Sequence, residues 1–120
     1  MSTAVPQQIA WADVEPQSLP GFDGRVTVKV LSGALGQVMR VEIAAGVVFP
    51  NPEDPSEQEV HPIEQILNVV SGCLRTVVAG REQLVKAGES LVMPAAVPHT
   101  VTALEDTVML EVFAPPVFPA

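Results

Sequence analysis

The chain is poor in cysteine, in basic residues and in aromatic residues. Its 120 residues include one cysteine, no tyrosine, two histidines, and six lysines and arginines against 14 acids. The single cysteine, Cys73, excludes an intrachain disulfide, and we expect it to be a small buried apolar residue because no histidine is near it in sequence. A net charge of −8 argues against nucleic acid and anionic membranes as partners, since both attract basic surfaces.

The chain also lacks long apolar runs. No run approaches the roughly 18 residues that span a membrane. The first residues, MSTAVPQQIAW, do not show the basic segment followed by an apolar segment that marks a signal peptide. We therefore expect a cytoplasmic protein. A length of 120 residues, 48 % of them hydrophobic, suits one domain with one core.

Twelve prolines and eight glycines are scattered along the chain and disfavour long helices. Apolar and polar residues alternate instead, which is typical of strands with one buried face. In residues 37–44, for example, Met39, Val41 and Ile43 share one face of the expected strand. The expected strands are residues 25–31, 37–44, 65–71, 73–79, 82–87, 90–94, 99–104 and 107–114.

Short valine-rich strands separated by glycine turns predict an all-β sandwich or small barrel. We expect residues 1–24 to form an N-terminal arm, because they contain three prolines and the turn-forming sequence GFDG. Residues 25–114 would form the barrel and residues 115–120 a short tail. The sequence FPNPEDPSE at 49–57 is expected to be a loop, since its prolines do not fit inside a sheet.

The two histidines, His61 and His99, are each expected to open a strand after a proline-containing turn. Taken singly, each would be interpreted as a surface residue. Glu59 and His61 are two positions apart, so on a strand they point to the same face, and Gln65 keeps that parity. His99 would arrive from another strand. An imidazole and a carboxylate close together are ordinary ligands for iron, manganese, nickel, copper or zinc.

The residues before and after His99 resemble the second part of the cupin signature, G-x5-P-x-G-x2-H-x3-N. The sequence GESLVMPAAVPH at 88–99 follows this pattern as far as its histidine. Ala96 stands in place of the second glycine, and Ala103 stands in place of the asparagine.

The residues around His61 resemble the first part of the same signature, G-x5-H-x-H-x3-E-x6-G. His61 and Gly72 match it, whereas Glu59 replaces the first histidine and Gln65 replaces the glutamate. Twelve residues separate Gly46 from Glu59 where the pattern has five, because the loop at 49–57 adds length.

The resemblance covers residues 25–114 and implies a cupin fold, a double-stranded β-helix of the jelly-roll type that is often dimeric. It also implies a divalent transition metal (iron, manganese, nickel, zinc or copper) in the barrel mouth. The metal ligands would be Glu59, His61, Gln65 and His99, of which two histidines and one carboxylate are similar to the facial triad of non-haem iron sites. Two alternatives stay open: Glu57 could take the place of Glu59, and the altered set could hold no metal.

The runs HPIEQ and VPHTVTALEDTVMLEVFAPP are more closely similar to the small cupins of pectin and alginate breakdown, which open unsaturated uronate rings. That group carries Asp-x-Phe near the last strand, where this chain has Glu111, Val112 and Phe113. The resemblance implies metal-assisted chemistry with Glu111 as general acid or base. Phe113 would pack on the apolar face of a sugar. Strand parity places Met109, Glu111 and Phe113 on one face, where an acid needs a partner or a role.

Arg40 and Arg75 lie in the middle of expected strands and could pair with Glu111 or bind a substrate carboxylate bidentately. An exposed position is the commoner outcome for a strand arginine. Three functions remain open: a metal-dependent enzyme acting on a small sugar acid or related carbonyl compound, a cupin dioxygenase or lyase acting on another small molecule, and a non-catalytic cupin that binds a small ligand. The expected partners are that small molecule and a second copy of the chain in a homodimer.

Overall fold

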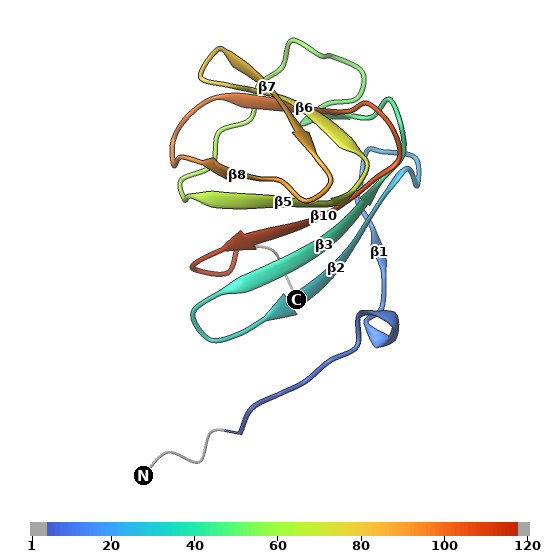
Figure 1. Ribbon diagram of the computed structural model, residues 1–120, viewed down its shortest axis with the longest axis vertical. Helices are drawn as coiled ribbons and strands as arrows, with labels where there is room; N and C mark the ends of the chain where they lie inside the picture. The colour runs from blue at the N-terminus through green and yellow to red at the C-terminus, as the bar shows by residue number, and fades with distance from the viewer. Residues whose placement is uncertain (1–4, 118–120) are drawn as a thin grey trace.

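The computed structural model describes residues 5–117, which form an antiparallel β fold (Figure 1). Among these residues, the one helical element is a single 3-10 turn, η1 (Trp11–Asp13). The strands are β1 (Gln17–Ser18), β2 (Val26–Ser32), β3 (Gln37–Ile43), β4 (Val48–Phe49), β5 (Gln65–Ser71), β6 (Cys73–Val78), β7 (Arg81–Lys86), β8 (Ser90–Met93), β9 (His99–Ala103) and β10 (Thr107–Phe113). Within residues 5–117, no helix is long and apolar enough to cross a membrane.

The strands form two sheets, and every neighbouring pair is antiparallel. One sheet has the order β1-β2-β3-β10-β5-β8, and the other has the order β4-β9-β6-β7. Figure 1 shows β6 and β7 at one end of the barrel and β2 and β3 at the other. Buried side chains from both sheets, such as Val41, Leu67, Leu74 and Val101, belong to one core cluster. The prediction of an all-β sandwich or barrel is confirmed.

Strand β3 shows how alternation builds this core. Met39, Val41 and Ile43 are buried, and the residues between them are partly or fully exposed. Val41 lies opposite Met109 of β10, whose side chain is also buried. A strand with period-2 alternation buries one face only, so the hydrophobic pattern sets the register of the sheet.

Two short strands were not expected. β4 and β1 have two residues each, which is too short for alternation to be visible in the sequence. Gln17 and Ser18 pair with β2, and Phe22 is buried in the core, so part of the expected arm packs on the barrel. Residues 5–10 extend away from the barrel (Figure 1). Residues 1–4 of the arm and 118–120 of the tail lie outside the described residues.

Candidate metal centre

A backbone bridge brings the two halves of the site together. The N–H of Glu59 donates to the carbonyl of His99 at 2.9 Å, and the N–H of His99 donates back to the carbonyl of Glu59 at 2.9 Å. His99 opens β9 as expected, but His61 lies in the loop before β5, so the prediction that it opens a strand is wrong. Three prolines upstream of Glu59 and one directly after His61 interrupt the ladder, because proline donates no hydrogen bond.

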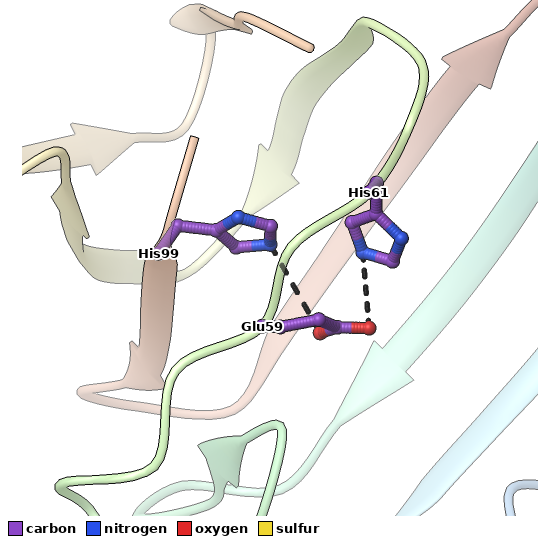
Figure 2. Close-up of side chains that lie close together, drawn as sticks. All are labelled: Glu59, His61 and His99. Atoms are coloured by element: carbon purple, nitrogen blue, oxygen red, sulfur yellow. Dashed lines mark ion pairs between the residues drawn. The ribbon is translucent and has the colours of Figure 1, made fainter. Parts of the chain in front are cut away.

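Three side chains converge at this bridge. One carboxylate oxygen of Glu59 lies 3.0 Å from His61 Nε2, and the other lies 3.9 Å from His99 Nε2. Figure 2 shows the Glu59 carboxylate pointing between the two imidazole rings, whose centroids are 5.2 Å apart. One ligand atom from each residue lies within 4.8 Å of the others. Glu57 is exposed on the loop, so the structure brings Glu59 rather than Glu57 to the histidines.

The environment of His99 favours the neutral imidazole. Burial lowers the pKa of His99, and this effect outweighs the Val97 carbonyl and the Glu59 carboxylate, which act in the opposite direction. His99 Nδ1 lies 3.2 Å from the Val97 carbonyl oxygen. A carbonyl can only accept, so Nδ1 carries the proton and the lone pair of Nε2 faces Glu59. A neutral histidine oriented by a second hydrogen bond is the form that binds metals.

These donor atoms are spaced close to, but somewhat wider than, the ligands of a first-row transition metal. Metal–nitrogen and metal–oxygen bonds of about 2.0–2.2 Å place neighbouring ligand atoms about 3.0–3.5 Å apart. The Glu59–His61 separation lies within this range, and the Glu59–His99 separation of 3.9 Å exceeds it by a few tenths of an ångström. The chemistry of the set, two imidazole nitrogens and one carboxylate, suits iron, manganese, zinc, nickel or copper.

A cavity of about 280 Å³ joins this group to the remaining candidates. Glu59, His61, Gln65, His99 and Glu111 all line it. Gln65 opens β5, and its side chain is buried. The expected four-residue ligand set therefore shares one cavity, with the three groups above in close contact and Gln65 on its wall.

Glu111 lies on the inner face of β10, together with Met109 and Phe113, as strand parity predicts. It pairs across the sheet with Met39 and Leu67, which offer it no charge. Burial among these apolar groups raises the pKa of Glu111 to about 7, and the Glu59 carboxylate adds to the shift. The acid that the sequence placed between two apolar residues is therefore tuned to titrate near neutral pH.

The two arginines that the sequence offered as partners of Glu111 lie elsewhere. Arg40 is on the outward face of β3 and pairs with Glu42 at 2.8 Å. Arg75 is on the exposed face of β6 and pairs with Glu82. Neither lines the cavity, and each occupies the exposed position that is commoner for a strand arginine.

The sequence reasoning missed the apolar wall of the cavity. Val28 and Leu67 face it from the larger sheet, Phe49 and Val101 face it from the smaller sheet, and Leu19 reaches it from outside the strands. Strand parity was a usable signal for Val28 and Leu67, since both lie on buried faces. It was not available for Leu19, which follows the two-residue strand β1.

The pH dependence of stability should report the Glu111 carboxyl. A pKa raised from 4.5 unfolded to about 7 folded means that the folded state holds the proton between these values. The stabilising contribution of the protonated Glu111 is then fully present below pH 4.5 and is lost as the pH rises through 7, by at most about 3 kcal/mol. In metal-free protein, Glu111→Gln should gain stability over the wild type at pH 8 but not at pH 4.5, measured by urea unfolding. The control, Glu105→Gln, changes an exposed acid and should show no such difference, whereas an equal effect of Glu111→Gln at both pH values would contradict the shift.

Ala96 occupies a position where the backbone calls for glycine. Its φ is +61°, in the left-handed region, and its N–H donates to the carbonyl of His61 at 2.8 Å. Ala96→Gly should therefore stabilise the protein by about 0.5–1 kcal/mol, because glycine reaches this conformation without steric cost. Ala95→Gly is the matched control. It should destabilise by a similar amount, since Ala95 has no positive φ. Equal effects of the two substitutions in urea unfolding would contradict this account.

The fold and the site together define a class: an antiparallel jelly-roll barrel with potential metal ligands in its cavity. The family described as Cupin domain matches residues 39–114. The chain belongs to this family, and the predicted cupin fold is confirmed. No curated protein matches the chain in sequence.

Solved structures show the same fold at low sequence identity. An RmlC-like cupin from Shewanella frigidimarina NCIMB 400 superposes with a TM-score of 0.77 at 17 % identity and covers 93 % of both chains. KdgF from Halomonas sp. gives a TM-score of 0.77 at 20 % identity, over 94 % of this chain and 96 % of its own. The polyketide cyclase RemF from Streptomyces resistomycificus gives 0.74 at 20 % identity, over 97 % and 88 %. Likeness at this identity establishes the fold alone.

Proposed function

We propose that the protein is a metal-dependent enzyme that moves a proton on a small carbonyl compound, in a reaction of the isomerase or lyase type. One observation carries this proposal. Glu59, His61 and His99 converge in the same cavity as Glu111, a half-buried residue whose carboxyl pKa is raised to about 7. A divalent metal bound to the three residues would supply a Lewis acid that polarises a carbonyl oxygen.

The other groups of the cavity have roles that follow from their positions. The Glu111 carboxylate would accept a proton at its Oε from the carbon beside the carbonyl and return it to a neighbouring atom. A group that titrates near pH 7 can act as acid and as base at neutral pH. Gln65 would orient the substrate through its amide. The apolar neighbours of Glu111 keep water from competing for the proton.

Two more specific functions of the same site can be distinguished by experiment. The resemblance to uronate-opening cupins supports a sugar acid as the substrate, with Phe113 against the ring. The two-histidine, one-carboxylate composition supports a dioxygenase, because it leaves open positions on iron. Oxygen uptake by iron-loaded protein over a substrate panel would favour the dioxygenase. The absence of any turnover, with metal bound, would favour a cupin that only binds a ligand.

The proposal is tested by solvent exchange in D₂O. Zinc-loaded protein is incubated with 2′-hydroxyacetophenone or with D-galacturonate, and NMR follows deuterium incorporation beside the carbonyl. We expect exchange with at least one compound, and about a 100-fold or greater loss of its rate in Glu111→Gln. Glu105→Gln should keep the wild-type rate. Exchange that is unaffected by Glu111→Gln, or no catalysed exchange with either compound, would contradict the proposal.

A further inference from the structure

No lysine or arginine side chain among the described residues lines the cavity. All six lysines and arginines of the chain fall within the described residues, and none of them lines the cavity. Arg40 and Arg75 are held in outward ion pairs. Lys29 donates to the Trp11 carbonyl at 2.8 Å, and Arg25 donates to the Phe22 carbonyl at 3.3 Å. A substrate carboxylate entering the cavity would find no guanidinium or ammonium group to bind.

The cavity has few polar side chains, and most of them would be occupied by binding the metal. The polar lining residues are Glu59, His61, Gln65, His99 and Glu111, and the rest of the lining is apolar. Glu59, His61 and His99 converge on one point, where they would hold the metal. Gln65 and Glu111 are left to meet a substrate. A sugar acid carries several hydroxyl groups besides its carboxylate, and burying them without partners is costly.

The negative charge of the site also disfavours an anionic ligand. Two of the five polar lining residues are acids, and the chain as a whole carries a net charge of −8. A bound divalent ion would share its charge with the Glu59 carboxylate. The field in the cavity therefore gives little attraction to an anionic ligand beyond the ion itself.

We propose that the cavity takes an uncharged, largely apolar carbonyl compound rather than a sugar acid. This inference rests on the proposed function for the role of the carbonyl group, and on the lining residues for the rest of the molecule. The carbonyl end would face Glu59, His61 and Glu111. The apolar end would lie against side chains such as Leu19 and Val28.

The first test compares the binding of two probes by isothermal titration calorimetry. 2′-Hydroxyacetophenone is uncharged and largely apolar, and D-galacturonate is a sugar acid. Each is titrated into metal-free protein and into zinc-loaded protein. We expect hydroxyacetophenone to bind at least about ten times more tightly to both forms. Equal or tighter binding of galacturonate to either form, or no binding of hydroxyacetophenone, would overturn the inference.

A substitution at the cavity wall makes the test directional. Val117 lines the cavity, is 49 % exposed and tolerates a long side chain. Val117→Arg supplies the missing cation and should strengthen galacturonate binding about 5-fold or more, while weakening hydroxyacetophenone binding. Val92→Arg adds the same charge at a valine that is 54 % exposed and does not line the cavity. It should leave both affinities unchanged, and the same response in both variants would overturn the inference.

These measurements can fail separately from the proposed function. If hydroxyacetophenone binds tightly but neither compound shows solvent exchange, the proton-transfer function is wrong and the assignment of ligand class stands. If galacturonate binds more tightly and exchanges, the function stands and the ligand class is wrong. Binding to the metal-free protein tests the cavity lining without any contribution from a metal.

Discussion

Replacing Gly72 with alanine should cost at least about 4 kcal/mol of folding free energy and lower the melting temperature by about 15 °C or more. Gly72 separates β5 from β6 and has a φ of +93°. A Cβ atom there would lie 2.4 Å from the Asp106 carbonyl oxygen, 2.4 Å from Thr107 Oγ1 and 2.7 Å from Thr107 Cα. Two of these atoms belong to the backbone, which cannot move aside without disturbing β10. The measurement is thermal and urea unfolding of the purified variant.

A second glycine separates the clash from the backbone strain. Gly88 has a φ of +84°, and a Cβ atom there would meet nothing within 4 Å. Gly88→Ala should therefore cost only the strain of a left-handed alanine, about 1–2 kcal/mol. If Gly72→Ala lowers the free energy of unfolding no more than Gly88→Ala does, the close approach of the 106–107 backbone is not the reason that position 72 requires glycine.

Replacing either histidine with alanine should weaken metal binding by at least about 100-fold. His61 and His99 each present Nε2 to the Glu59 carboxylate, at 3.0 and 3.9 Å. Removing one of these nitrogens leaves two of the three converging ligands. Affinity for Zn²⁺ is measured by competition with a chelator of known affinity, and circular dichroism confirms that the variants fold.

Glu57→Ala is the matched control for the histidine variants. Glu57 is exposed, lies in the same loop as Glu59, and was the rival ligand on sequence grounds. Its removal should leave the affinity for Zn²⁺ within about two-fold of the wild type, as expected for an exposed charge near a site. Loss of affinity in Glu57→Ala together with full affinity in His61→Ala would reassign the ligands.

The β-barrel could be predicted from the sequence because its strands and turns are marked by local sequence patterns. Alternation along residues 37–43 and 107–113 predicted which side chains face the core, and Glu111 fell on the inner face for the same reason. The glycines between strands marked the turns. Strands β1 and β4 could not be predicted, because two residues are too few to show the alternation of apolar and polar side chains. Part of the expected arm packs on the barrel because Phe22 is buried in the core. No local sequence pattern indicates such a tertiary contact.

The site was readable in part. The two-residue spacing predicted that Glu59 and His61 point to one face of a strand. In the structure they lie in a loop, and Glu59 is hydrogen-bonded to the backbone of His99 in β9. Ala96 departed from the cupin pattern, and the structure explains why glycine is usual there, since φ is +61°. Alternation along residues 37–43 placed Arg40 on the face opposite Met39 and Val41, and the structure has it there. The sequence did not decide the position of Arg75, because apolar residues stand on both faces of residues 73–79. Its ion pair with Glu82 depends on how β6 and β7 align.

Glu59, His61 and His99 are proposed to hold one divalent transition metal. The most direct test of this proposal is elemental analysis of the purified protein, before and after incubation with iron, manganese, nickel or zinc, with His61→Ala treated in parallel. We expect one metal ion per chain in the wild type and none in the variant. A wild-type protein that stays metal-free after incubation, or a variant that keeps one ion per chain, would contradict the proposal.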